Sequence, residues 1–295
     1  MKELIEKVAF VILNYNNSQD TVECIESVQK IDYKNFEIIL IDNDSTDDSV
    51  DILSSKFPKI TLIQTGINLG YAGGNNVGIK KAIDSKADYI CVLNNDVVVD
   101  TNFLTILIDS IKKNPDIGII GPRICEYSQP TIIQSTGATI NLNRGTLDII
   151  NGNCEESSIP FSLLDCDYIG GACMLFSKDL IANIGYIPED YFLFYEETEW
   201  CLKAKKLGYR VVCNTESKVI HKGSASIGKV SGLAEYYLYR NRVYFIKKNA
   251  SVKNKLIFYP YLILTTFYKV LLKKQNKKSI KFYLDGFCEK DSYRK

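Results

Sequence analysis

The chain has 295 residues, 46% hydrophobic and 24% charged, which is the composition of an ordinary folded protein. Its formal net charge of +1 gives no general argument for nucleic-acid binding, and we expect none. Nine cysteines without a CxxC pair favour reduced, buried thiols in a cytosolic protein over disulfides or a zinc site.

The first hundred residues alternate between strand patterns and helix patterns. Strand-like apolar runs occupy 8–16, 36–45, 60–65 and 89–96, and helix patterns occupy 18–31, 48–57 and 75–85. This alternation predicts βαβ units that form a parallel sheet covered on both faces.

Polar residues follow each apolar run of this half. They are Asn14–Asn16, Asp42–Asp44, Asn68–Asn76 and Asn94–Asp96. Because ligands bind beyond the carboxyl ends of parallel strands, we expect all four groups to lie along one functional edge of the sheet.

Two of these groups have a functional and a structural interpretation. A carboxylate at Asp42 can accept hydrogen bonds from a nucleobase or a ribose, but it can equally cap the next helix. The glycine-dense stretch Asn68–Ile79 opens a helix whose N–H groups can bind an anion. It lacks the dinucleotide fingerprint and the Walker loop, so a plain glycine turn explains it as well.

Asn94, Asn95 and Asp96 follow the last apolar run of this half. Magnesium and manganese take oxygen ligands and keep positions for water and phosphates, so one protein carboxylate is sufficient if a diphosphate completes the shell. The alternative is a polar turn after a strand.

The middle of the chain, 101–225, is less regular. A helix is expected at 102–113, and two glycines precede an apolar strand in "DYIGGACMLFSKDLI". A second helix begins near Glu196 and ends at Gly208. Short β-like runs follow at 210–214 and 218–223.

Three acids stand at the start of this second helix. Glu196 and Glu197 follow the aromatic run "YFLFY", which can desolvate a carboxylate and raise its pKa as a general base requires. Glu199 and Lys203 have the i,i+4 spacing of a solvated ion pair. All three acids would also suit a helix N-terminus without any catalytic role.

His221 is the sole histidine of the chain and follows a short apolar run. A structural role is the ordinary interpretation of a lone histidine. Its place at a strand end leaves a ligand role open.

Eight stretches, in order, resemble glycosyltransferase family two. They are "VILNYN", "IDNDSTD", "NLGYAGGNNVGI", "LNNDV", "GGACMLF", "YFLFYEETEWCLKAKKLGY", "HKGSAS" and "YYLYRNR", and they run from Val8 to Arg242. Within the family, the likeness is to bacterial enzymes often called rhamnosyltransferases, which build surface polysaccharides. The resemblance implies an α/β GT-A fold, Rossmann-like with a mostly parallel central sheet flanked by helices. It also implies a nucleotide-sugar donor, Mn²⁺ or Mg²⁺, and inversion at the anomeric carbon.

The resemblance also assigns roles by position. Asp42 would contact the base, and Asp96 matches the last acid of the family's DxD metal motif, with Asn94 at its first position. An arginine common in relatives is replaced here by Asn75. Nucleotide contacts are expected at Asn14, Asn16, Asp42, Asn68, Gly73, Asn75 and Asn95.

Glu197 falls on the family's catalytic base, where relatives usually carry Asp, and His221 matches a histidine that reaches the metal in several relatives. Gly170 and Gly171 match a region near the donor and acceptor sugars, and Glu196 and Glu199 are grouped with it. Arg240 and Arg242 are candidates for contacts with a phosphate or a lipid headgroup.

The C-terminal part is strongly basic. From Arg240 onward it holds fifteen Lys/Arg and three Asp/Glu, and lysines flank the uncharged run Leu256–Tyr268. Thirteen residues are too few to span a membrane, but apolar, lysine-flanked segments suit an anionic bilayer surface. We expect peripheral attachment to the cytoplasmic face of the membrane; the alternative is a helical cap on the catalytic domain.

The sequence therefore predicts a catalytic domain at 1–229 and a helical, basic extension at 230–295. Residues 1–100 would bind the nucleotide sugar and 101–229 the acceptor. The predicted function is an inverting, metal-dependent transfer from a UDP- or dTDP-sugar to a glycan or polyprenyl-diphosphate-linked acceptor in surface polysaccharide synthesis. The alternatives are a nucleotidyltransferase, whose glycine- and Lys/Arg-rich signature is missing after the first strand, and a non-catalytic sugar-nucleotide binder or scaffold.

Overall fold

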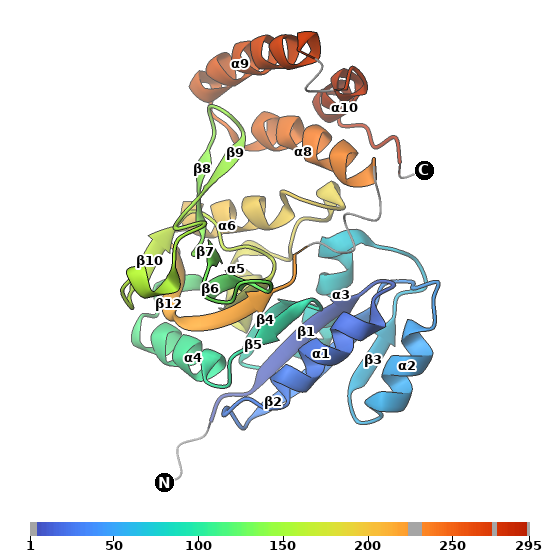
Figure 1. Cartoon of the computed structure of the whole chain (residues 1–295), viewed down its shortest axis with the longest axis vertical. Helices are drawn as coiled ribbons and strands as arrows, with labels where there is room; N and C mark the ends of the chain where they lie inside the picture. The colour runs from blue at the N-terminus through green and yellow to red at the C-terminus, as the bar shows by residue number, and fades with distance from the viewer. Residues whose placement is uncertain (1–4, 224–231, 273–275, 294–295) are drawn as a thin grey trace.

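The computed structural model describes residues 5–223, 232–272 and 276–293. A ten-stranded mixed sheet forms the centre of the molecule, with three C-terminal helices stacked at one end (Figure 1). The order along the main path of the sheet is β10-β12-β6-β11-β4-β1-β2-β3. β5 pairs with β12, and β7 pairs with β6.

The first half of the chain supplies the parallel part of the sheet, as predicted. β1 lies between β2 and β4, and β3 completes the edge, all parallel. The elements are β1 (Val8–Asn14), α1 (Ser18–Val28), β2 (Phe36–Asp42), α2 (Ser49–Lys56), β3 (Thr61–Gln64), α3 (Gly70–Asp84) and β4 (Tyr89–Asn94). Helix α3 begins at Gly70, five residues before the predicted start, so most of the glycine-rich stretch is helical.

The second half adds antiparallel pairs. β11 runs antiparallel to β4 and β6, while β12 runs parallel to β6. The elements are β5 (Val97–Val99), α4 (Phe103–Lys113), β6 (Ile117–Glu126), β7 (Ile133–Ser135), β8 (Ala138–Asn141), β9 (Thr146–Ile149), η1 (Glu156–Ser158), β10 (Leu163–Cys166), β11 (Cys173–Ser177), α5 (Lys178–Ile184), η2 (Glu189–Tyr191), α6 (Glu196–Lys206) and β12 (Arg210–His221). The two short β-like runs after α6 form one strand, because a register shift between Asn214 and Lys218 absorbs the polar residues that separate them.

The hydrophobic core lies on both faces of the sheet. Phe10 and Ile12 of β1 pack with α1, α2 and α4, and the alternate residues Ala9 and Val11 pack with α3, α5 and α6. All nine cysteines are free thiols and seven are buried, as expected for a chain without disulfides.

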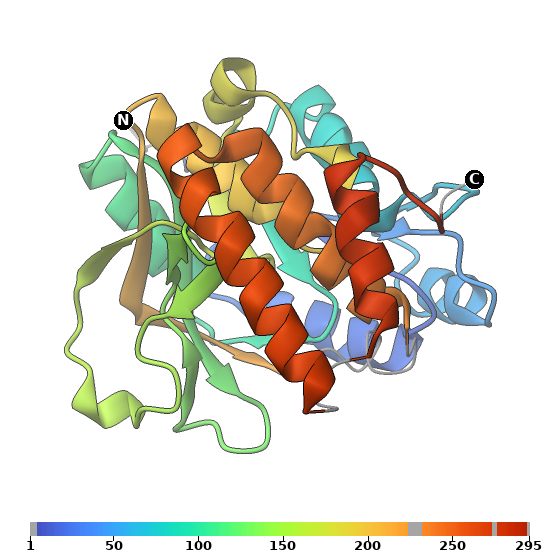
Figure 2. The same ribbon diagram turned by 90° about the horizontal axis from the view of Figure 1, so that it is seen from above.

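Three C-terminal helices form a separate layer over α6, and the predicted helical extension is confirmed. They are α8 (Leu233–Asn249), α9 (Val252–Leu271) and α10 (Lys278–Phe287). Seen from above, α9 and α10 lie foremost (Figure 2). The predicted domain boundary at 229/230 falls outside the described residues, so that division stays a prediction.

Candidate active site

A cavity of about 190 Å³ lies at the carboxyl edge of the parallel strands. Each of the four polar strand ends contributes to its lining, so the expectation that they share one edge is confirmed. The lining residues from these strand ends are Tyr15, Asn43, Asn68, Gly70, Tyr71, Asn94, Asn95 and Asp96. The remaining lining residues are Leu13, Phe192, Leu193, His221, Leu233 and Ala234, of which Leu233 and Ala234 were not singled out in the sequence.

Asp42 is buried behind the cavity wall and fully hydrogen-bonded. Its Oδ1 accepts from Asn14 Nδ2 at 2.9 Å and from Ser45 Oγ at 2.6 Å, and its Oδ2 accepts from Ser45 N at 3.0 Å. The alternative in which Asp42 caps the next helix is wrong, because α2 begins at Ser49 with Asp48 as its N-cap. The carboxylate instead shapes the turn after β2.

The turn after β1 and the turn after β2 are joined by Asn16. Its side-chain oxygen accepts from Thr46 N at 2.7 Å, and its own N–H donates to Ser45 Oγ at 2.9 Å. The neighbours Tyr15 and Asn43, rather than Asn16 and Asp42, line the cavity. Sequence position alone did not separate these adjacent residues.

The glycine-rich stretch contributes its first residues to the cavity and the rest to packing. Asn68 Oδ1 accepts from Gly70 N at 2.9 Å and from Asn43 Nδ2 at 3.0 Å. Gly70 has φ +72°, and a Cβ there would collide with the Phe192 carbonyl oxygen. Of the other predicted nucleotide contacts, Gly73 and Asn75 are buried within α3, and neither lines the cavity.

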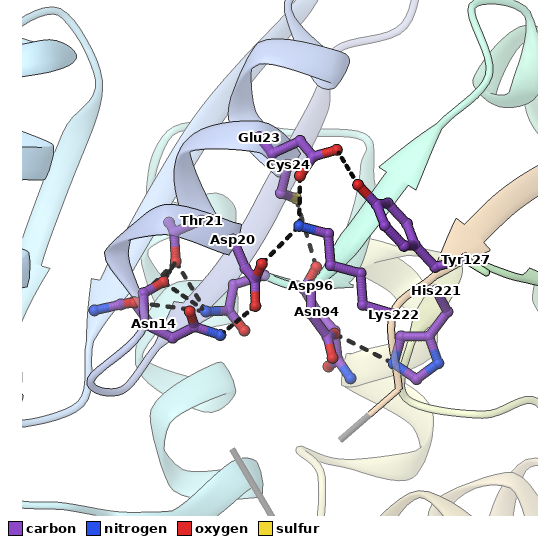
Figure 3. Close-up of polar contacts among 12 residues, drawn as sticks. Asn14, Asp20, Thr21, Glu23, Cys24, Asn94, Asp96, Tyr127, His221 and Lys222 are labelled. Carbon is purple, nitrogen blue, oxygen red and sulfur yellow. Dashed lines mark hydrogen bonds and ion pairs between the residues drawn. The ribbon is translucent and has the colours of Figure 1, made fainter. Parts of the chain in front are cut away.

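Asp96 and His221 come together from two distant parts of the chain (Figure 3). Asp96 Oδ1 lies 3.2 Å from His221 Nε2, because β12 ends beside the turn between β4 and β5. His221 Nδ1 lies 2.7 Å from Gln134 Oε1 on β7. An amide oxygen only accepts, so Nδ1 is the donor in this contact, and in the neutral tautomer of the ring Nε2 presents a lone pair toward Asp96.

This pair fits a divalent cation. Asp96 Oδ1 is buried. Although it lies close to the imidazole, it accepts no hydrogen bond. A carboxylate oxygen and the nitrogen of a neutral imidazole are donors that a divalent cation accepts, and Gln134 holds the imidazole as an outer partner does in metal sites. Within the described residues there is no group of three His, Cys, Asp or Glu side chains that could hold a metal. Most of the ligands would therefore have to come from the bound diphosphate and water.

The side-chain amide of Asn95 is not directed at the Asp96–His221 pair. Its Nδ2 donates to Thr21 Oγ1 on α1 at 2.8 Å, which turns the amide toward the helix. Beside it, Lys222 ties the end of β12 to α1 through ion pairs with Asp20 and Glu23 (Figure 3). These contacts fix the strand end that carries His221.

Glu196 and Glu197 begin α6 behind the Tyr71 wall of the cavity. Burial raises the pKa of Glu197 to about 7, against the lowering effect of backbone hydrogen bonds, including one with Gly171. Burial, followed by the charge of Glu197, raises the pKa of Glu196 well above its usual range. Glu196 Oε2 is buried without a hydrogen-bond partner. The pair is thus poised to hold protons near neutral pH.

Gly171 makes room for this pair. A Cβ at Gly171 would collide with Glu197 Oε1 and with the Tyr71 hydroxyl, which donates to the Gly171 carbonyl at 2.9 Å. The structure therefore brings Glu197, Gly171 and Tyr71 to one point. A Cβ at the adjacent Gly170 would meet only the ring of Tyr168 at ordinary distance. Tyr71 was missed at the sequence level, although it stands inside the glycine-rich motif.

Glu199 belongs to a different environment, and the predicted solvated pair with Lys203 is wrong. Glu199 is 3% exposed and lies under α8, where it accepts from Asn249 Nδ2 at 2.9 Å and pairs with Lys248 Nζ at 2.9 Å. The Tyr191 hydroxyl also bonds to it. Packing of α8 over α6 buries this carboxylate, which does not line the cavity.

Neither Arg240 nor Arg242 lines the cavity where phosphate contacts were predicted. Both guanidinium groups are bound by backbone carbonyl groups: Arg240 donates to Asp190 O and Lys290 O, both at 3.0 Å, and Arg242 Nε donates to Arg144 O at 2.9 Å. In this arrangement the arginines join helix α8 to the loops that it covers.

Asn241, between these arginines, is hydrogen-bonded to the loop that leads into α6. Its amide donates to the carbonyl oxygens of Tyr191, Leu193 and Phe194 at 2.9, 2.7 and 3.0 Å. Three residues of this loop, Phe192, Phe194 and Tyr195, have φ between +66° and +75°, which non-glycine residues rarely adopt. A single buried side chain thus stabilises a strained loop directly before Glu196 and Glu197.

The chain is similar in sequence and in fold to known proteins. The family model described as Glycosyl transferase family 2 matches residues 9–181. The chain is 26% identical over 251 residues to the low-salt glycan biosynthesis hexosyltransferase Agl10 of Haloferax volcanii, covering 84% of this chain and 77% of that one. It is 23% identical over 210 residues to the N-acetylglucosaminyl-diphospho-decaprenol L-rhamnosyltransferase of Mycobacterium tuberculosis, covering 65% and 68%.

The fold is similar to that of GalNAc-T7 solved with UDP, GalNAc and Mn²⁺. The TM-score is 0.63 at 16% identity, over 82% of this chain and 51% of that chain. This likeness shows the fold, a mostly parallel α/β sheet flanked by helices.

Proposed function

Because the chain belongs to glycosyltransferase family 2, with a match over more than half of its length, we propose that it transfers a sugar from a nucleotide-diphosphate donor to a hydroxyl group of a glycan or lipid-linked acceptor. The observation that carries this proposal is the arrangement around one cavity. A cation-type pair, Asp96 and His221, lies at its strand edge, and the raised-pKa carboxylate Glu197 lies behind its Tyr71 wall.

Glu197 is the proposed general base. A carboxylate with a pKa of about 7 is partly deprotonated at neutral pH and still basic enough to accept the proton of an attacking hydroxyl. The acceptor oxygen then bonds to the anomeric carbon, the bond to the diphosphate breaks, and the configuration inverts. The missing side chain of Gly171 leaves the space that Glu197 Oε1 and the Tyr71 hydroxyl occupy, and Tyr71 itself lines the cavity.

Asp96 and His221 would hold Mn²⁺ or Mg²⁺, which supplies charge neutralisation for the departing diphosphate. The residues themselves place one buried carboxylate oxygen and one imidazole nitrogen at the cavity wall. UDP and dTDP are the proposed donor nucleotides. Asn43 and Asn68 are the proposed nucleoside contacts, since both residues line the cavity.

Surface polysaccharide synthesis is the proposed context. Two relatives are named for glycan biosynthesis and for a diphospho-decaprenol-linked acceptor, which supports a glycan or polyprenyl-diphosphate-linked acceptor here. An acceptor of that kind resides in a membrane, so we extend the proposal to peripheral attachment at the cytoplasmic face. The helical extension is then a separate unit from the catalytic domain.

Donor binding provides the test. UDP- and dTDP-sugars should raise the melting temperature more with Mn²⁺ than without it, because a ligand that binds only the folded state stabilises it. Slow donor hydrolysis should accompany the shift. A chain that binds no nucleotide sugar with either metal would contradict the proposal, and donor binding without any hydrolysis or transfer would favour a non-catalytic binder.

A further inference from the structure

Helix α9 exposes an unusually apolar outer face. It has 20 residues, and only Phe258, Leu262 and Thr266 are buried against the rest of the protein. Six large apolar side chains on it are between 61% and 72% exposed: Leu256, Ile263, Leu264, Phe267, Tyr268 and Leu271. Water-exposed apolar surface of this extent on one helix marks an interaction surface.

Helix α10 extends the same surface. An apolar groove of about 370 Å³ runs between the two helices, with Phe267 on the α9 side and Leu284 on the α10 side. Leu284 and Phe287 are 58% and 49% exposed. Both helices form the outermost layer of the molecule, at the end away from the N-terminus (Figures 1 and 2).

The charges around this surface identify its partner. Lys269 on α9 and Lys277, Lys278 and Lys281 at α10 are exposed. The one carboxylate of these helices, Asp285, is 7% exposed and bonded to Tyr236 and Ser292. Glu289, just after α10, is exposed but paired with Lys247 Nζ at 2.8 Å. Cationic side chains therefore predominate around the apolar face, as at the interface of an anionic bilayer. A second copy on the same face would bring like charges together.

We propose that the outer face of α9 and the α9–α10 groove embed in the interfacial layer of an anionic membrane, with α9 parallel to the membrane plane. No helix in the described part of the chain is long and apolar enough to cross a membrane, so contact is interfacial. The proposal rests on the surface itself and not on the chemistry of the cavity.

Vesicle flotation of the full chain tests this. We expect binding to vesicles with anionic lipid, weaker binding to phosphatidylcholine alone, and weakening by salt. Leu264→Ser with Phe267→Ser should reduce the partition coefficient about 100-fold, because each side chain contributes over 1 kcal/mol on burial. Lys277→Glu with Lys281→Glu should reduce binding to anionic vesicles only. Since all four side chains are exposed, the melting temperature should not change.

Phe161→Ser is the matched control, because Phe161 is 68% exposed on another part of the molecule. It should leave flotation unchanged. Absence of binding to anionic vesicles would overturn the proposal. So would a wild-type dimer that Phe267→Ser dissociates, since a second copy would then occupy the face. Donor hydrolysis measured without vesicles separates the two proposals. If the wild-type chain does not hydrolyse the donor, the transferase function is contradicted. If it hydrolyses the donor but does not float with vesicles, only the membrane proposal is contradicted.

Discussion

Two carboxylates near the cavity, Asp96 and Glu197, have opposite surroundings. Asp96 meets an imidazole nitrogen whose orientation is fixed by Gln134. Glu197 meets a second carboxylate, buried apolar groups and a few backbone donors. The same functional group is therefore prepared for a cation in one place and for a proton in the other. Burial decides this for Glu197, and the neighbouring imidazole decides it for Asp96.

The largest expected effect is at Glu197. Glu197→Gln keeps the size of the side chain but cannot accept a proton, so kcat should fall about 1,000-fold while donor binding persists. The measurement is transfer or donor hydrolysis, with thermal stabilisation by the donor as proof of binding.

Glu216→Gln, an exposed change away from the cavity, is the control and should leave kcat unaltered. Undiminished turnover in Glu197→Gln would show that another group acts as the base.

Substitutions at the proposed cation site should affect metal-dependent donor binding as well as catalysis. Asp96→Asn should lower kcat/KM about 100-fold and abolish the extra stabilisation that Mn²⁺ gives to the donor complex, because it replaces a carboxylate ligand with an amide. Gln134→Leu, which frees His221 Nδ1, should cost about 10-fold.

Isothermal titration calorimetry with Mn²⁺, in the presence and absence of UDP, measures the affinity of the protein for the metal directly. We expect weak binding of Mn²⁺ without nucleotide, since the described part of the chain offers two donors, Asp96 and His221, and position 94 holds an amide. Tight binding without UDP would contradict this arrangement, and the exposed Asp148→Asn variant serves as the matched control.

Asn241 tests how far the Glu197 side depends on the C-terminal helices. Asn241→Ala removes three hydrogen bonds from the loop before α6, so kcat should fall about 10-fold with little change in the KM for the donor. As a positioning residue it should also move the acidic limb of the pH–rate profile, which a purely structural change would leave in place. If the acidic limb of the pH–rate profile is unchanged and only the stability of the fold is reduced, Asn241 has a purely structural role.

The last prediction concerns the stability of the fold and its dependence on pH. Glu197 has a folded-state pKa of about 7 against an ordinary value of 4.5, so its protonated form favours the folded state. Its contribution is fully present below pH 4.5 and is lost as pH rises through about 7, a change of roughly 3 kcal/mol. Urea denaturation between pH 5 and 8 should show declining stability with rising pH in the wild type and a flatter curve in Glu197→Gln. Equal slopes would argue against the raised pKa. Activity should move the opposite way and increase through pH 7, since the base must be deprotonated.

Much of the fold and part of the site followed from local patterns. The period of apolar residues gave the strands and helices of the first half, and the direction of parallel strands placed their polar ends on one edge. The sequence also suggested Asp96, His221 and Glu197 as candidates. The inferences about the elements and the shared edge succeeded because they depend on neighbours within a few residues or on a general rule of sheet topology, whereas the roles of the three candidates stay predictions.

What only the tertiary structure decided is which side chains of a polar motif face the cavity and which face the protein. Glu197 and Glu199 are two positions apart on one helix, yet one lies beside Gly171 and the other under α8. Arg240 binds the backbone carbonyl groups of Asp190 and Lys290 and does not line the cavity, and Gly73 is buried within α3. The physical reason is that burial, pKa and hydrogen bonding depend on residues brought close by folding, such as Gln134 beside His221, and no local pattern records those distances.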